Sequence, residues 1–445
     1  MKRYEKYKPA CLEWIGDVPV EWKTMHIKFT SACKNGLFID GDWIESKDLA
    51  GDSGTIRYLT SGNVGVIKYK EQGDGYITKE KFDELLCTEV MPGDILISRL
   101  NEPIGRACIV PKLDSKIVCA VDNVIFRPNN SLYDRRFLVY QMNCKAYSDY
   151  TNCLARGTGM HRISRAMLGQ ISIMIPSLPE QTSIANFLDE KCAKIDNVVE
   201  VQQKRIELLK ELKQSIITHA VTKGLDKNAK MKDSSVDWIG KVPEHWEVKS
   251  LKFFVEVADG THDTPKSVEQ DDNTFPLVTS KCVENGIINF DLAYHISKND
   301  YEEISKRSYV KKFDVIMPMI GTVGNPAIVT SDDKFAIKNV ALFRTVSNYE
   351  KAKWLVYLLN STIVKNNLES LNRGGVQNFV SQDIIKNMKL IFPPLAEQTA
   401  IAAYLDKKCA TIDAQIAKVE RQIDLLNEYK QSVITECVTG QRKVC

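Results

Sequence analysis

The 445-residue sequence lacks the motifs that identify several classes of enzyme. It contains no Gly-x-x-x-x-Gly-Lys-[Ser/Thr] phosphate loop and no Gly-x-Gly-x-x-Gly, the patterns that hold nucleotides and dinucleotides. It also has no Asn/Asp-Pro-Pro-aromatic tetrapeptide of the kind used by amino-methyltransferases, and no metal-nuclease pattern stands out. We therefore expect a chain that binds and positions its partners without catalysis, and that needs no cofactor of its own.

Long apolar runs and paired metal ligands are missing as well. No stretch approaches the roughly 20 apolar residues of a membrane span, and no secretory signal is readable, so we expect a cytoplasmic protein without membrane contact. The 12 cysteines include no Cys-x-x-Cys pair and the 6 histidines no close pair, which argues against a metal site. The formal net charge is only +3. A DNA-binding surface would therefore need local clusters of Lys and Arg.

The sequence does contain an internal repeat, which is the most informative feature of a chain this long. Residues 11–28 are echoed at 235–252, where the Trp14-Ile-Gly, Val18-Pro and Trp22 elements return as Trp238-Ile-Gly, Val242-Pro and Trp246. Tryptophan buries a large apolar area. We therefore predict that this element packs as a plug in each copy rather than contacting a ligand.

A second echo is longer and predicts two long helices, at 177–222 and 394–439. From Glu180-Gln-Thr and Glu397-Gln-Thr onward the two segments stay in register without a gap. Pro179 and Pro394 suit a first helical turn, and the early glutamates suit its dipole. A helix of about 44 residues is about 65 Å long at 1.5 Å per residue.

Apolar residues in these helices step by three and four, the spacing of a coiled-coil seam. We predict an intramolecular coiled coil, which must be antiparallel if the two copies are related by a two-fold axis. The alternative is a pair of ordinary core helices. The predicted seam consists of Leu188, Ile195, Val199, Ile206, Leu209, Ile216, Leu405, Ile412, Ile416, Val419, Ile423, Leu426 and Val433.

The regions before the helices mix short apolar runs with amphipathic stretches and Gly-containing polar loops. Strands are predicted at 94–98, 107–110, 123–126, 314–317 and 340–343, and helices at 135–143 and 353–359. This pattern is typical of an α/β or α+β globule, present twice. We divide the chain into a first globular domain (1–176), a first helix (177–225), a second globular domain (226–393) and a second helix (394–445).

Polar loops fall at matching places in the two globular domains and supply candidate DNA contacts. Arg recognises guanine, Asn and Gln recognise adenine, and Ser, Thr and Lys bind phosphates. The simpler interpretation is that these loops are turns with solvated side chains. The candidates are Arg99, Asn101, Arg106, Arg156, Thr158, His161, Arg162, His262, Thr264, Lys281, Thr322, Asn325, Arg373, Gln377 and Asn378.

Together these motifs resemble the specificity subunit of type I restriction-modification enzymes. The resemblance rests on Trp238-Ile-Gly-Lys-Val-Pro-Glu-His-Trp246, Pro393-Pro-Leu-Ala-Glu-Gln398 and residues 421–435, each with a first copy, so it spans the whole chain. One departure concerns the first module, where Asn35-Gly-Leu-Phe38 stands in our alignment opposite Asp259-Gly-Thr-His262.

The resemblance implies two target-recognition domains, each reading one half of a bipartite, asymmetric site in double-stranded DNA. It implies that the paired helices act as a spacer and dock two modification (methyltransferase) subunits. S-adenosylmethionine, ATP and Mg would serve those subunits and the restriction (translocase and nuclease) subunits. Two other hypotheses stay open: a self-sufficient methyltransferase or nuclease, and a coiled-coil adaptor that binds no nucleic acid.

Overall fold

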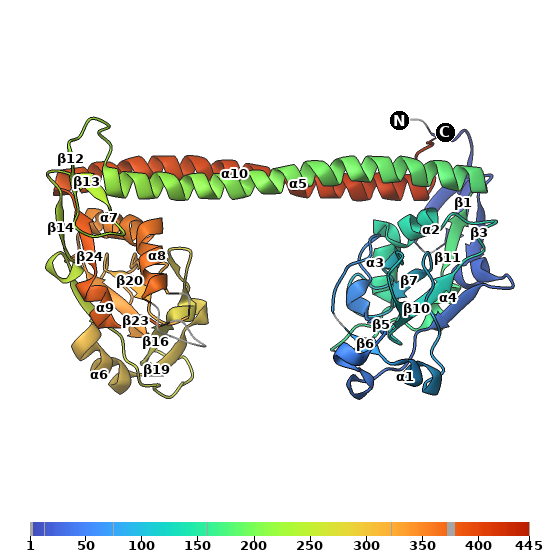
Figure 1. Cartoon of the computed structure of the whole chain (residues 1–445), viewed down its shortest axis with the longest axis horizontal. Helices are drawn as coiled ribbons and strands as arrows, with labels where there is room; N and C mark the ends of the chain where they lie inside the picture. The colour runs from blue at the N-terminus through green and yellow to red at the C-terminus, as the bar shows by residue number, and fades with distance from the viewer. Residues whose placement is uncertain are drawn as a thin grey trace. The chain divides into compact units, whose positions relative to one another are not determined.

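The structure is a computed structural model of the chain and describes residues 3–12, 14–73, 75–157, 159–321, 323–371 and 379–444. The chain forms two units, Met1–Gln202 with Arg421–Cys445 (unit 1) and Gln203–Glu420 (unit 2). Each unit therefore contains one globular domain and one part of each long helix, α5 (Leu178–Lys223) and α10 (Leu395–Val438) (Figure 1).

The globular part of unit 1 has eleven strands and four helices among its described residues. The strands are β1 (Tyr7–Leu12), β2 (Ile15–Pro19), β3 (Lys23–His26), β4 (Leu37–Asp40), β5 (Ile56–Leu59), β6 (Tyr76–Ile77), β7 (Ile95–Ser98), β8 (Ala107–Ile109), β9 (Lys116–Cys119), β10 (Asn123–Arg127) and β11 (Ser172–Ile175). The helices are α1 (Lys79–Glu84), α2 (Arg135–Met142), α3 (Lys145–Leu154) and α4 (Arg165–Gln170).

The globular part of unit 2 repeats this order and adds the hairpin of β17 and β18. Its strands are β12 (Met231–Asp233), β13 (Lys241–Pro243), β14 (Glu247–Ser250), β15 (Glu256–Asp259), β16 (Thr274–Thr279), β17 (Val283–Glu284), β18 (Ile287–Ile288), β19 (Tyr294–Ser297), β20 (Val315–Pro318), β21 (Ala327–Ile328), β22 (Ala336–Lys338), β23 (Val340–Arg344) and β24 (Lys389–Phe392). Its helices are α6 (Lys298–Ser308), α7 (Tyr349–Leu359), α8 (Thr362–Ser370) and α9 (Gln382–Asn387).

The sheets of unit 1 have counterparts in unit 2. The antiparallel sheet β4-β10-β7-β8 corresponds to β15-β23-β20-β21, and the three-stranded sheet β6-β5-β9 to β19-β16-β22. In both three-stranded sheets one pair is parallel, β5 with β9 and β16 with β22. The expected fold class is confirmed: two mixed α and β domains of one topology are joined by two long helices.

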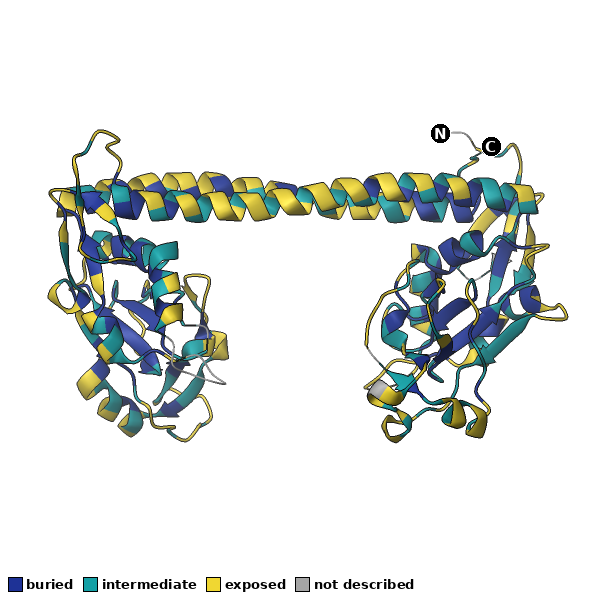
Figure 2. Ribbon diagram, viewed as in Figure 1, coloured by how far each residue is buried: buried dark blue, intermediate teal, exposed yellow. Residues whose placement is uncertain are grey.

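The central strands are buried on both faces, as Figure 2 shows for the interior of each unit. In β7, Ile95 and Ile97 belong to the main core with α2, whereas Leu96 faces a smaller core beside β5 and β9. In β20, Val315 and Ile316 are divided between two cores in the same way. A strand covered on both faces needs a continuous apolar run, which is the pattern found in the sequence.

The two long helices pair antiparallel. In unit 1 the Lys430 ammonium on α10 lies 2.5 Å from the Asp196 carboxylate on α5. In unit 2 the corresponding pair, with the helices exchanged, joins Lys213 to Asp413 at 2.7 Å. None of the predicted seam residues is exposed, and six of them are buried: Leu188, Ile195, Leu405, Ile412, Val419 and Val433.

The tryptophan element packs against the helix ends. Trp22 in unit 1 and Trp246 in unit 2 are both buried, and their indole N–H groups donate to Glu180 (3.2 Å) and Glu397 (3.0 Å) in the first turns of α5 and α10. Gly440, at φ +75°, follows α10. A Cβ on this glycine would lie 2.3 Å from Pro19 Cδ and 3.4 Å from the Trp22 ring, so a side chain there would collide with Pro19. A left-handed glycine is a common helix terminator. The predicted packing of the tryptophan element is therefore found at the contact between each globular domain and a helix end, here called the helix joint.

Candidate nucleic-acid interface

Equivalent aspartates end the outer strands of the two four-stranded sheets. Asp40 of β4 pairs with Val124 of β10, and Asp259 of β15 pairs with Ala341 of β23. Each aspartate precedes a glycine whose N–H donates to the central strand, Gly41 to Asn123 (2.8 Å) and Gly260 to Val340 (2.9 Å). A Cβ on either glycine would lie within 2.4 Å of a backbone carbonyl oxygen, so only glycine fits this approach.

This register corrects the alignment made from the sequence. The segment equivalent to Asp259-Gly-Thr-His262 is Asp40-Gly-Asp-Trp43, not Asn35-Gly-Leu-Phe38. A difference in the length of the preceding loops hid the correspondence. The exposed Trp43 therefore occupies the position that His262 has in unit 2.

In unit 2 the His262 imidazole is held between two side chains. Its Nε2 lies 3.1 Å from Asp259 Oδ2 and its Nδ1 lies 2.9 Å from Asn339 Oδ1. Arg307 of α6 also pairs with Asp259, so this buried carboxylate has two partners. The His262 side chain remains 54% exposed and is presented in a fixed orientation.

A groove of about 830 Å³ lies beside this histidine. Two predicted residues, Thr264 and Lys281, line it together with Lys338 and Asn339, which were not predicted from the sequence. Lys338 Nζ donates to Thr264 Oγ1. Two ammonium groups and several hydroxyls in one groove are suited to a phosphate backbone, and an amide beside them is suited to a base edge.

In unit 1 the structure brings the two predicted polar loops together. Leu100 pairs with Arg162 as an antiparallel bridge, Asn101 N–H donates to the His161 carbonyl (3.3 Å), and Arg156 exchanges two 3.0 Å backbone hydrogen bonds with Arg162. The exposed side chains of Asn101, Arg156, His161 and Arg162 thus come from neighbouring backbone segments. His161 Nδ1 lies 3.7 Å from Glu102.

Acidic residues orient two arginines at this surface. Arg162 pairs with Asp122 at 2.7 Å, and Arg165 on α4 pairs with Asp40 at 2.9 Å. Both arginine side chains stay nearly half exposed. Arg165 was not predicted, because a single arginine at a helix start carries no distinguishing signal in the sequence.

Two predicted arginines are instead engaged inside unit 1. The Arg106 guanidinium donates to the carbonyl oxygens of Ser61, Val64, Leu100, Asn101 and Pro103. Arg99 is buried, donates to the Val121 carbonyl and pairs with Asp40 at 3.3 Å. Burial lowers the pKa of both groups. These residues hold the loops that carry Asn101 and Arg162.

The corresponding loops of unit 2 are described in part. Ile320 bridges to Phe379, and Val380 N–H donates to the Met319 carbonyl at 3.0 Å, which is the pairing of residues 99–101 with 162–163 in unit 1. Asn325 is half-buried with φ +54°. The predicted Thr158, Thr322, Arg373, Gln377 and Asn378 lie outside the described residues.

A second pair of sites lies beside the long helices, one in each unit. The groove in unit 1 has a volume of about 660 Å³ between α10 and the start of α3, and the groove in unit 2 about 560 Å³ between α5 and the start of α8. Five lining residues are identical at corresponding positions: Glu428 and Glu211, Gln431 and Gln214, Ser432 and Ser215, Thr435 and Thr218, Thr439 and Thr222.

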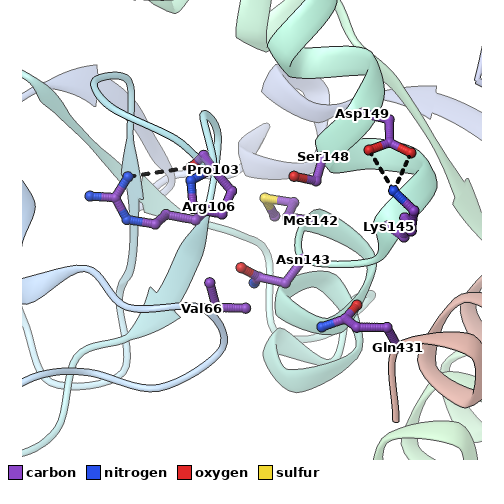
Figure 3. A pocket seen from close by; sticks show the side chains of 9 residues that line it. All are labelled: Val66, Pro103, Arg106, Met142, Asn143, Lys145, Ser148, Asp149 and Gln431. Carbon is purple, nitrogen blue, oxygen red and sulfur yellow. Dashed lines mark hydrogen bonds and ion pairs between the residues drawn. The ribbon is translucent and has the colours of Figure 1, made fainter. Parts of the chain in front are cut away.

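A smaller cavity of about 220 Å³ shares Lys145, Asp149 and Gln431 with the groove in unit 1. Figure 3 shows the Lys145–Asp149 ion pair on α3 and the Gln431 amide from α10 at this cavity. Among the described residues no group of three His, Cys, Asp or Glu side chains is arranged to hold a metal ion. No helix in the described part of the chain is long and apolar enough to cross a membrane.

The repeated domain, the antiparallel helices and the paired sites indicate a protein built from two related recognition domains on one helical scaffold. Residues 19–229 and 243–423 match the family model of the type I restriction modification DNA specificity domain. The chain belongs to this family, which confirms the resemblance noted from the sequence. Type I specificity subunits are the non-catalytic DNA-recognition subunits of their enzymes, so the expectation of a non-catalytic chain is confirmed as well.

Individual relatives are similar along most of the chain. The type I restriction enzyme MjaVIII specificity subunit of Methanocaldococcus jannaschii is 26% identical over 429 residues, which cover 92% of this chain and 95% of the relative. The EcoBI specificity subunit of Escherichia coli is 22% identical over 375 residues, covering 79% and 74%.

Solved structures share the fold. The HsdS subunit of Thermoanaerobacter tengcongensis matches with a TM-score of 0.51 and 16% identity, over 96% of this chain and 98% of its own. A chain from a study of complex assembly and conformational transition of the type I R-M system matches with a TM-score of 0.70 and 14% identity, over 96% and 99%. Both comparisons concern the fold alone.

Proposed function

We propose that this specificity subunit reads an asymmetric, bipartite site in double-stranded DNA, one half through each unit. Two modification subunits dock on its helices, and restriction subunits join the assembly. S-adenosylmethionine, ATP and Mg act in those partner subunits, and this chain contributes recognition and spacing.

The observation that carries the proposal is that the two units share the same backbone arrangement at these strand ends but present different exposed side chains. Asp40 and Asp259 end equivalent strands, yet the turns after them present Trp43 in unit 1 and His262 in unit 2. Identical modules related by a two-fold axis read palindromes. Two modules that share a backbone fold but differ in their exposed side chains are suited to two unlike half-sites.

The equivalent grooves beside the helices support docking of two copies of one partner. A partner that is present twice must meet the same chemistry twice, and five lining positions carry the same residue in both grooves. Glu436 and His219 occupy corresponding positions and differ. The two docking sites are therefore expected to have similar but unequal affinities.

Exchange of the second globular domain tests the recognition model. Residues 247–393 are replaced by the same segment of another specificity subunit, and methylated bases in host DNA are mapped by long-read sequencing. We expect one half of the motif to change and the other half to stay. A change in both halves, or in neither, would contradict the model. A wild-type complex without sequence preference would favour the adaptor hypothesis, and methylation by the purified chain alone would favour the enzyme hypothesis.

Docking is tested by placing a bulky charge in each groove. Ser432 and Ser215 are exposed and line the grooves of units 1 and 2. Each single variant, Ser432→Arg or Ser215→Arg, should bind one modification subunit, and the double variant none, as counted by native mass spectrometry. Gln422→Arg and Gln203→Arg, at exposed helix positions outside the grooves, serve as controls. Full occupancy of the double variant would refute docking at the grooves.

A further inference from the structure

The turn that carries Trp43 is anchored on both sides. Gly41 N–H and Asp42 N–H donate to the carbonyl oxygens of Asn123 and Cys119, both at 2.8 Å. The Asp42 carboxylate accepts a 3.0 Å hydrogen bond from Thr88 N–H, and Tyr58 Oη donates to the Ile44 carbonyl at 3.4 Å. The indole therefore projects from a backbone whose conformation is already fixed.

Trp43 is nevertheless 69% exposed. Water contact over most of a tryptophan is unfavourable, and a rigid, exposed aromatic side chain is suited to a binding surface because ordering it costs little entropy. The Lys47 and Trp43 side chains lower the pKa of the Glu45 carboxylate, and Lys47 pairs with that carboxylate at 2.5 Å. The apolar faces of the indole are left for a partner.

The surroundings of Trp43 indicate which partner. Asp40, three residues before it, holds Arg165 at 2.9 Å, and the bridge between Asp42 and Ala120 brings the turn close to Asp122, which holds Arg162. An exposed aromatic side chain on a turn close to the two aspartates that orient half-exposed arginine side chains fits DNA. The arginines are suited to phosphates or guanine, and the indole is suited to the apolar parts of bases.

The equivalent position in unit 2 sharpens the assignment. Gly260 and Thr261 donate to Val340 and Ile337 (2.9 and 3.0 Å) as Gly41 and Asp42 do in unit 1. The side chain at the tip of that turn is His262, whose ring nitrogens contact Asp259 and Asn339. The same pattern of backbone hydrogen bonds thus presents an apolar side chain in unit 1 and a polar side chain in unit 2.

We infer that Trp43 is a specificity-determining residue of unit 1, which contacts bases of its half-site through apolar surface. The inference rests on the proposed function, because it needs unit 1 to read a half-site. Two base features offer such surface, the thymine methyl group in the major groove and a partly unstacked base step.

The test uses the complete complex with its modification subunits. Trp43→Ala, Trp43→Phe and Trp43→His are compared with Phe29→Ala, which removes another exposed aromatic side chain of unit 1. We expect Trp43→Ala to relax at least one position in one half of the methylated motif and to leave the other half unchanged. Affinity for the cognate duplex should fall at least about tenfold, whereas binding to unrelated DNA and the salt dependence should stay the same because no charge is lost.

Partial recovery in Trp43→Phe, and an altered base preference in Trp43→His, would support a contact rather than a structural role. Replacing thymine by deoxyuridine in the half-site tests the methyl contact, and 2-aminopurine fluorescence tests an unstacked step. An unchanged motif and affinity in a folded Trp43→Ala complex would overturn the inference, as would an equal loss on all DNA. A wild-type complex without a split motif would overturn the proposed function and this inference with it.

Discussion

The long helices α5 and α10 with their contacts to the globular domains, here called the frame, and the turns that carry Trp43 and His262 have diverged to different extents. The Lys430–Asp196 pair of unit 1 recurs as Lys213–Asp413 in unit 2, with the helices exchanged. The turn that carries Trp43 keeps its backbone hydrogen bonds in unit 2 but presents His262.

The proposed function would explain this difference. A frame that held two copies of one partner would be constrained at each contact, because a change in one copy removes the equivalence. A turn that read bases would need only a rigid backbone, and its exposed side chain could change at little cost to stability. Substitutions at frame contacts that are the same in both units should therefore have equal effects, and substitutions where the surrounding contacts differ should not.

The largest effect is expected at the buried tryptophans. Trp22→Ala and Trp246→Ala each remove a buried side chain and leave a glutamate at a helix start without its indole donor. Each should lower the free energy of unfolding of its own unit by about 3–5 kcal/mol. Hydrogen exchange of α2 and α7 measures the two units separately. Phe29→Ala and Phe253→Ala, at exposed positions, should cost less than about 0.5 kcal/mol. A large loss in only one unit would contradict the equality of the frame.

Much of this frame was predictable because its signals are local. The gap-free repeat and the three-four spacing placed both helix starts within one residue of Leu178 and Leu395. The apolar runs marked β7, β10, β20 and β23 because these strands are buried on both faces. Pairing of β5 with β9 was not predictable, because parallel neighbours are joined through distant segments.

The candidate site was harder to predict, since it depends on contacts that composition does not encode. Arg106 and Arg162 are the same residue type, yet Arg106 donates hydrogen bonds to five backbone carbonyl oxygens and Arg162 is exposed. Trp43 was missed because loops of unequal length shifted the alignment by five residues, from Phe38 to Trp43. The Asp-Gly step before it, repeated at Asp259-Gly260, was the signal that could have corrected the register.

A smaller effect, again equal in the two units, is expected at the tyrosines of α2 and α7. Tyr140 donates to Asp189 and Tyr357 to Asp406, both at 2.8 Å, and burial raises the pKa of both phenols. Tyr140→Phe and Tyr357→Phe should each cost about 1.5 kcal/mol, the value of a hydrogen bond to a charged group. The same exchange measurement applies. Unequal losses in the free energy of unfolding would show that the contacts between globular domain and long helix differ in strength between the two units.

The smallest effect is expected at the helix ion pairs, and here the units should differ. Asp196 also binds Lys68 of the first globular domain at 2.6 Å, and its carboxylate is 31% exposed, whereas that of Asp413 is 53% exposed. Asp196→Asn should cost about 1 kcal/mol, and Asp413→Asn about 0.3 kcal/mol. In the Asp196→Asn background, Lys68→Ala should cost nothing further, which a double-mutant cycle measures.

The pH dependence gives this contrast a direction. Burial alone would raise the pKa of Asp196, but Lys430 and Lys68 outweigh it and the pKa is lowered. The unfolded chain, with an Asp pKa of about 3.9, then binds the proton first as the pH falls. The stability that Asp196 contributes should be complete above about pH 5 and decline progressively below about pH 4, so wild type and Asp196→Asn should converge in acid. A difference that did not shrink as the pH falls below about 4 would mean that Asp196 acts through packing rather than charge.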